Sequence, residues 1–152
     1  MRTRLARQSD VPGICRLIQI YADQGVLLPR NEEQVRAHLG HFLVLTEGGP
    51  ANASGAALPE KLLGCVALEP YGSDLAEIRS LAVEPEAHNL GLGGRLVEAA
   101  LSTARRRKIA RVFAVTHAAP FFEHHGFQAT SRFELPEKIA RDCTGCPKNA
   151  AR

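Results

Sequence analysis

The sequence has no tryptophan, one methionine and only 5% aromatic residues among its 152 positions. With so few aromatic side chains, the chain has little material for the stacking platforms that bind single-stranded nucleic acid. Apolar runs such as 42–45 are four residues long, whereas a membrane-spanning helix needs roughly 20. The net charge of +3 is too small to indicate nucleic-acid binding by itself. We therefore expect neither a membrane protein nor a nucleic-acid-binding one.

A secretory signal is also missing. Residues 1–7 are basic but no apolar segment follows them, so we expect a cytoplasmic protein. The 45% hydrophobic and 23% charged residues are typical of a folded chain rather than a disordered one. The length suits one domain over 1–152, in which 136–152 form a tail that contains a Cys-x-x-Cys pair.

Apolar spacing and turn signals predict two helices before the first strand. Asp10 is expected to cap the first helix, with Pro12 in its first turn, and Asn31 with Gln34 has the capping-box spacing of the second. The order that follows indicates an α/β (α+β) fold, with a mixed central β-sheet flanked by helices. The later expected elements are strands 42–47, 62–68 and 75–83, a turn at 70–72, helix 92–107, strand 112–115, helix 120–125 and strand 127–133.

Residues 77–96 form the most informative stretch, a strand and a turn followed by a glycine-rich loop that opens into a helix. The free N–H groups at a helix start attract phosphate, and glycines let the backbone approach the anion. No Gly-Lys-Ser/Thr follows, so this is not a Walker loop. It is not a Gly-x-Gly-x-x-Gly dinucleotide fingerprint either, because that motif follows the first strand of a parallel unit. By the glycines alone, a phosphate-binding loop and an ordinary turn both stay open.

The stretch Val83-Glu84-Pro85, followed by x-x-Gly-x-Gly and an amphipathic helix, resembles the acetyl-CoA motif of the GNAT superfamily of N-acetyltransferases. Residues 120–127, PFFEHHGF, resemble its second motif. The likeness implies the GNAT fold, and it implies that the backbone of Leu81, Ala82 and Val83 pairs with the pantetheine arm of acetyl-CoA. It assigns the pyrophosphate to residues His88, Asn89, Leu90, Gly91, Leu92, Gly93, Gly94 and Arg95. His88 stands where the superfamily usually has Arg or Gln, so Asn89 or Arg95 is expected to share the anion.

Residues 25–30, 75–83, 112–116 and 135–138 are more specifically similar to the short, single-domain bacterial N-acetylglutamate synthases. This resemblance implies acetyl transfer from acetyl-CoA to the α-amino group of L-glutamate, the first step of arginine biosynthesis. A substrate with two carboxylates needs fixed cations. The expected substrate-binding residues are Arg30, Arg79, Ser80 and Lys138. The alternatives are a solvated loop charge for Arg30 and a surface ion pair with Glu77 for Arg79.

Glu77 matches the general base that is proposed for that family, and the alternative is a carboxylate that only pairs with Arg79. Many superfamily members protonate the leaving thiolate from a tyrosine of the second motif, where this chain has Phe122. Thr116, His117 or solvent is expected to do so here. Backbone N–H groups of strand 75–83 would stabilise the oxyanion.

Cys143 and Cys146 supply half of a zinc site, whose other half would have to come from His117, His124, His125 or a second subunit. A disulfide or two free thiols is favoured, and we assign no metal. Cys15 and Cys65 are expected in the core. An edge strand near the C-terminus suggests a homodimer. Two alternative functions stay open, a GNAT enzyme for another small amine and an acetyl-CoA-binding module without activity.

Overall fold

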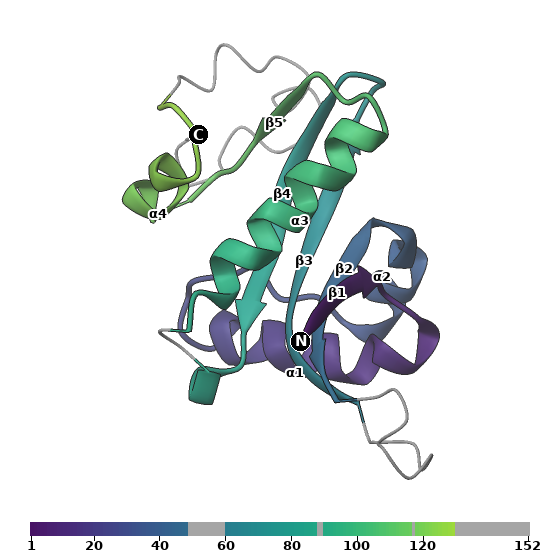
Figure 1. Ribbon diagram of the computed structural model, residues 1–152. Helices are drawn as coiled ribbons and strands as arrows, with labels where there is room; N and C mark the ends of the chain where they lie inside the picture. Colours follow the sequence, from purple (N-terminus) through teal and green to yellow (C-terminus); the bar gives the residue numbers. More distant parts are fainter. Residues whose placement is uncertain (49–59, 88–89, 117, 130–152) are drawn as a thin grey trace, which may run out of the picture.

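The computed structural model describes residues 1–48, 60–87, 90–116 and 118–129. Its centre is one five-stranded sheet with the order β1-β2-β3-β4-β5 (Figure 1). The first four strands pair antiparallel and β5 pairs with β4 in parallel. This mixed sheet confirms the predicted fold class. The strands are β1 (Arg2–Leu5), β2 (Phe42–Glu47), β3 (Lys61–Tyr71), β4 (Leu75–Val83) and β5 (Arg111–Phe113).

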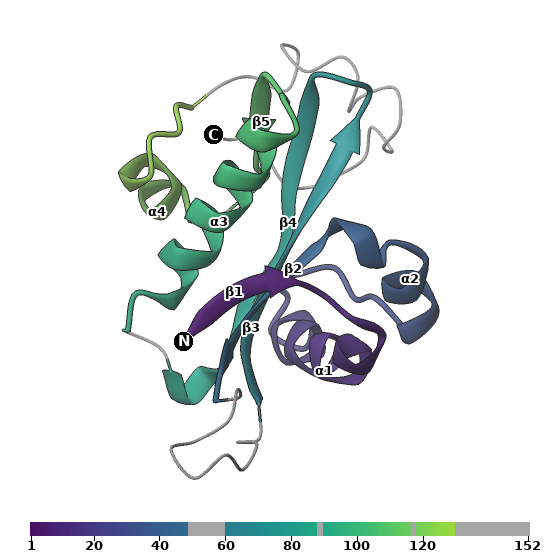
Figure 2. The ribbon, with the colours of Figure 1, turned by 45° about the vertical axis from the view of Figure 1, so that its right-hand side comes forward.

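Helices cover both faces of the sheet. One face carries α1 (Val11–Ala22) and α2 (Glu32–Ala37), and the other carries α3 (Leu92–Arg106) (Figure 2). The short helix α4 (Ala119–His124) follows β5 and contacts the first turn of α3. Three 3₁₀ helices complete the described part of the chain: η1 (Gln8–Asp10), η2 (Leu39–His41) and η3 (Pro85–Ala87). Within the ranges described, no helix has the length and apolar character needed to cross a bilayer.

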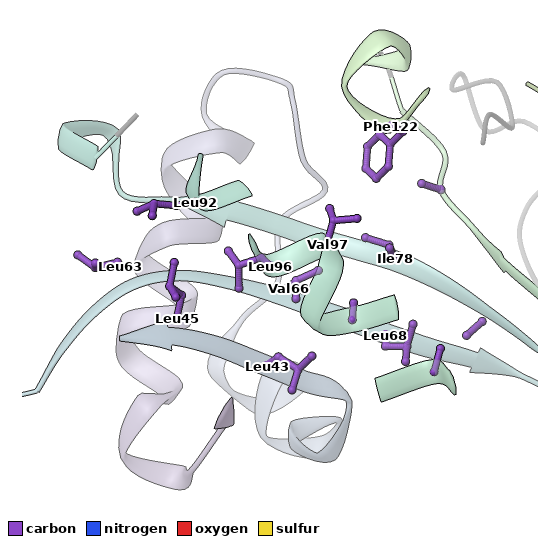
Figure 3. Packing of buried hydrophobic residues seen from close by; sticks show 14 of the residues in the cluster. Leu43, Leu45, Leu63, Val66, Leu68, Ile78, Leu92, Leu96, Val97 and Phe122 are labelled. Atoms are coloured by element: carbon purple, nitrogen blue, oxygen red, sulfur yellow. The ribbon is translucent and has the colours of Figure 1, made fainter. Parts of the chain in front are cut away.

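Each face of the sheet has its own hydrophobic core, because side chains alternate between the two faces of a strand. The core under α3 includes Leu43, Leu45, Leu63, Val66, Leu68, Ile78, Leu92, Leu96, Val97 and Phe122 (Figure 3). The core under α1 includes Val11, Ile14, Leu17, Ile18, Val35, Phe42, Val44, Cys65, Ala67 and Ala82. Cys65 is fully buried and Cys15 packs against this second core, as predicted, and both are free thiols.

The two predicted helix caps differ in outcome. Asp10 precedes α1 but makes no side-chain hydrogen bond to it. Its Oδ2 instead accepts from the Arg7 N–H at 2.7 Å and from Arg4 Nη1 at 2.8 Å, so the carboxylate holds the turn before the helix. Asn31 does cap α2: its Oδ1 accepts from the Gln34 N–H, and its own N–H donates to Gln34 Oε1, both at 2.8 Å.

Three segments differ from the expectation. Strand β1 was expected only as a basic terminus, although it pairs with β2 from Arg2↔Thr46 to Leu5↔Leu43. Strand β3 continues to Tyr71, so the turn lies at 72–74 rather than at 70–72. The last predicted strand spans 127–133, but residues 127–129 are not in a strand and 130–133 lie outside the described residues.

The parallel pair separates soon after it begins. Strand β5 pairs only with Leu75, Ala76 and Glu77 of β4. Beyond Glu77 the two strands diverge, and β5 leads away to α4 (Figure 1). The second half of β4 therefore has a backbone edge that β5 does not cover.

Candidate active site

Glu77 is a buried carboxylate at the point where β5 leaves β4. The residue is 4% exposed. Its Oε1 accepts a hydrogen bond of 3.0 Å from Tyr71 Oη and lies 3.3 Å from Arg79 Nε. Glu77 and Arg79 are two residues apart on one strand, so both side chains project on the same face, the one that α1 covers. The ion pair between Arg79 and Glu77, which was the alternative to substrate binding for Arg79, is therefore present.

A second buried carboxylate stands directly across from the first. Glu69 of β3 pairs in register with Glu77 and is also 4% exposed. Its Oε2 lies 3.4 Å from His41 Nδ1. Burial lowers the pKa of His41 below that of a free imidazole, although Glu69 acts in the opposite direction. Glu69, His41 and Tyr71 were not predicted from the sequence. The one signal for Glu69 was a charged residue directly after the apolar run 62–68.

Arg30 reaches the same face from the end of the loop before α2. Its Nη1 donates to Ser80 Oγ at 3.3 Å, and its guanidinium carbon lies 5.1 Å from the centre of the Phe42 ring. Burial and the like charge of Arg79 lower the pKa of Arg30. Within the part of the chain that the structure describes, Arg30 makes no ion pair. It is a desolvated cation whose contacts are to a hydroxyl and an aromatic ring, which makes it a strong site for a carboxylate.

Ser80 lies at a bulge in β4. The register with β3 changes between Cys65↔Ala82 and Ala67↔Arg79, so Ser80 and its successor oppose a single residue of β3. Ser80 has a φ of 54°, which is unusual for a residue other than glycine. The Cys65 thiol donates to the Ser80 carbonyl at 3.4 Å. The bulge interrupts the regular pairing with β3 directly after Arg79.

The end of β4 has an edge that pairs with no strand among the described residues, of the kind expected for a pantetheine arm. Leu81 and Val83 are half-buried against the core under α3, while Ala82 is buried in the core under α1. The Val83 carbonyl accepts a hydrogen bond of 2.6 Å from Tyr21 Oη of α1. A carbonyl oxygen has two lone pairs, so this contact leaves capacity for a second donor.

The start of α3 presents backbone N–H groups at the same end of the sheet. Gly91 caps the helix with a φ of 73°. A shallow depression of about 470 Å³ lies there, and the exposed Arg95 is in its wall. It is lined by Thr3, Gly91, Gly94, Arg95, Glu98, Ala99 and His125. The first four N–H groups of a helix have no intrahelical acceptor, so this end can bind an anion.

Two glycines of this loop also have a packing role. A Cβ on Gly94 would lie 2.9 Å from His125 Cε1, and one on Gly93 would lie 3.4 Å from the Phe121 ring. These two glycines allow α4 to pack closely on α3. Of the other predicted phosphate ligands, Leu90 is exposed and Leu92 places its side chain in the core.

Thr116 lies between β5 and α4, where its Oγ1 accepts a 2.8 Å hydrogen bond from the Ala118 N–H. Its hydroxyl hydrogen is still available as a donor. The remaining predicted site residues, His88, Asn89, His117 and Lys138, lie outside the described residues, as do Cys143 and Cys146.

Comparison with known proteins finds one family over most of the chain. Residues 38–129 match the acetyltransferase (GNAT) domain. An uncharacterized N-acetyltransferase of Chlorobaculum tepidum is 36% identical over 148 residues, which cover 97% of this chain and 88% of that protein. The amino-acid acetyltransferase of Mycobacterium tuberculosis is 38% identical over 124 residues, which cover 82% of this chain and 66% of that protein.

A solved structure is similar in both fold and sequence. N-acetylglutamate synthase from Neisseria gonorrhoeae, complexed with coenzyme A and N-acetyl-glutamate, superimposes with a TM-score of 0.79 at 32% identity. The match covers 98% of this chain but only 34% of the gonococcal one. The chain thus spans about a third of that longer synthase.

Proposed function

Because the chain belongs to the GNAT family of acetyl-CoA-dependent N-acetyltransferases, we propose that its acceptor is the α-amino group of L-glutamate. The products are then N-acetylglutamate and CoA. The amino-acid acetyltransferase of M. tuberculosis and the gonococcal N-acetylglutamate synthase, at 38% and 32% identity, support an amino-acid acceptor. The C. tepidum relative is named only as an N-acetyltransferase, so the amino acid has to be argued from the site.

The observation that carries the proposal is the state of Arg30. This half-buried cation makes no ion pair within the described chain and stands beside Ser80 on the same face as Glu77. A desolvated guanidinium is stabilised strongly by a carboxylate, which it can bind through two parallel hydrogen bonds. Arg30 therefore suits one carboxylate of glutamate. Arg79, which already contacts Glu77 through Nε, is the candidate for the second carboxylate.

Glu77 is the proposed general base. The acceptor arrives as an ammonium, and Glu77 takes a proton from it directly or through a water molecule. The neutral amine then forms a bond to the thioester carbonyl carbon. The carbon–sulfur bond breaks as the intermediate collapses, and the nitrogen loses its remaining extra proton to solvent. Tyr71 and Arg79 both contact Glu77 Oε1, so they fix the orientation of the carboxylate. Backbone N–H groups at the Ser80 bulge are the proposed donors to the oxyanion.

The acetyl-CoA end of the reaction is assigned to the uncovered edge of β4 and the start of α3. Residues 81–83 would pair with the pantetheine arm, and the N–H groups from Gly91 onward would hold the pyrophosphate. A thiol with a pKa of about 8.5 is a good leaving group, so solvent is sufficient to protonate the thiolate, and Thr116 or His117 would assist.

The test is release of free thiol from acetyl-CoA with a panel of amino acids, with the product identified by mass spectrometry. We expect turnover with L-glutamate to exceed that with L-aspartate, L-glutamine and L-lysine. D-glutamate is the matched control, since it carries the same charges with the α-carbon inverted. Efficient turnover of another amine, with none of glutamate, would overturn the assignment of the acceptor.

A further inference from the structure

Two histidines and a buried carboxylate meet at the start of β2, beside the acceptor face. His38 follows α2 and His41 ends η2, and their rings stack with centroids 5.3 Å apart. Glu69 approaches from β3. One nitrogen of each ring and one oxygen of Glu69 all lie within 4.8 Å of one another. The acetyl-transfer mechanism uses none of these three side chains.

The spacing of the two inner groups suits a metal ion. His41 Nδ1 and Glu69 Oε2 are 3.4 Å apart. Zinc binds imidazole nitrogen and carboxylate oxygen at about 2.0–2.2 Å, and in a tetrahedral site neighbouring ligand atoms are then about 3.3 Å apart. The two atoms already have this separation, and a ring nitrogen of the exposed His38 lies within 4.8 Å of both.

His41 presents a buried ring nitrogen to the cluster. His41 Nδ1 is inaccessible to solvent and, among the described residues, has no hydrogen-bond partner of normal geometry. A ligated metal ion would satisfy this buried nitrogen.

The three groups differ in burial. His38 is exposed and His41 is partly exposed, while Glu69 is buried, so the cluster is open to solvent on one side and fixed by the sheet on the other. This arrangement gives an ion a route of entry and a rigid carboxylate ligand.

We propose that His38, His41 and Glu69 form a binding site for a divalent transition metal of the zinc class. Two histidines and one carboxylate are a ligand set of zinc sites that keep a fourth, open position. Imidazole ligands select zinc, nickel or copper over magnesium. The site departs from the sequence-based expectation that no metal is bound, and it does not depend on which amine the enzyme acetylates.

The experiment measures metal binding directly, on full-length protein with any purification tag removed. Cys143 and Cys146 are an alternative pair of zinc ligands, so the background is the Cys143→Ser/Cys146→Ser double variant. After treatment with EDTA, this protein is titrated with zinc by calorimetry, and cobalt is added as a spectroscopic probe. We expect one zinc per chain, a cobalt spectrum typical of nitrogen and oxygen ligands, and no binding of magnesium.

Ligand variants separate this site from adventitious binding. We expect His41→Asn and His38→Asn each to weaken zinc binding by at least about tenfold, as loss of a ligand does. His38 is exposed, so its variant tests the site even if a change at His41 or Glu69 impairs folding. His124→Asn, an exposed histidine of α4, is the matched control and should bind zinc as the background does. The proposal is wrong if the background protein binds no zinc. It is also wrong if the His38 and His41 variants bind zinc as tightly as the background protein does.

Discussion

At the scale of single residues, the acceptor face contains two arginines in different states. Arg79 contacts the carboxylate of Glu77, whereas Arg30 contacts only a hydroxyl and the face of an aromatic ring among the described residues. An arginine that already contacts a carboxylate contributes mainly to orientation, and a desolvated one without such a contact gains most from an anionic ligand. The two residues should therefore respond differently to substitution.

Replacement of Arg30 should weaken binding of glutamate. We expect Arg30→Ala to raise the KM for L-glutamate about tenfold or more, because a charge-assisted hydrogen bond contributes about 1.5–3 kcal/mol. The KM of Arg30→Lys should lie between those of the wild type and Arg30→Ala, since lysine keeps the charge without the planar guanidinium. Steady-state kinetics at saturating acetyl-CoA gives the measurement. Arg36→Ala, an exposed arginine of α2, is the control; an unchanged KM in Arg30→Ala would contradict the assignment.

Replacement of Glu77 should affect the chemical step instead. We expect Glu77→Gln to lower kcat by about 10²–10⁴-fold, the usual contribution of a positioned general base. Glu33→Gln makes the same change of charge at an exposed site in α2 and should leave kcat unaltered. Circular dichroism checks that Glu77→Gln folds, because its carboxylate is buried and accepts from Tyr71. A folded variant with full kcat would rule out Glu77 as the base.

At the scale of elements, the start of α3 depends on one backbone conformation. Gly91 caps the helix at a φ of 73°, and a Cβ built there would meet no atom within 4 Å. The cost of a side chain at Gly91 is therefore a backbone cost. Gly94 is different, since its backbone is helical and a Cβ there would crowd the His125 ring.

The corresponding prediction concerns stability. Gly91→Ala should lower the free energy of unfolding by about 1–2 kcal/mol, the cost of a left-handed conformation for an L-residue. Gly91→Asn should lower it less, because asparagine tolerates this region better. Urea unfolding gives the values. Gly40→Ala is the matched control: its Cβ is also in open space but the φ of Gly40 is not positive, so no comparable loss is expected.

At the scale of the whole molecule, an ionic network fastens the N-terminal strand to the rest of the sheet. Glu60 accepts from Arg4 Nη2 at 2.7 Å and from Thr46 Oγ1 at 3.0 Å, and Arg4 also pairs with Asp10 at 2.8 Å. The network thus connects β1 with β2, with the residue before β3 and with the turn before α1. Hydrogen bonds from Arg4 lower the pKa of Glu60 from 4.5 to about 2.

This network predicts a dependence of stability on pH. The pKa of Glu60 is lower in the folded state than in the unfolded state, so its contribution is complete above pH 4.5 and is lost as the pH falls toward about 2. The urea midpoint of the wild type should therefore drop more steeply over this interval than that of Glu60→Gln. Glu47→Gln, an exposed carboxylate at the end of β2, should follow the wild type. Parallel curves for the wild type and Glu60→Gln would contradict the prediction.

Much of the fold was predictable because it follows from local patterns. The apolar spacing of 14–21 predicted α1, the bounds 75–83 match β4, and Gly91 before the periodic segment predicted the start of α3. Strand β1 was missed because arginine and threonine alternate there without a hydrophobic face. Its pairing with β2 and the network around Glu60 hold it in place, and neither is visible in a segment of four residues.

The sequence by itself determined the family, the acetyl-CoA motif and the three residues Arg30, Glu77 and Arg79 as candidates for the acceptor site, since each lies in a short motif. Only the tertiary structure decided that Glu69 stands across from Glu77 and that His41 approaches Glu69, because an antiparallel register joins residues that no local spacing connects. It also decided which arginine is already engaged with a carboxylate. That distinction depends on burial and on contacts between elements, which a linear pattern does not contain.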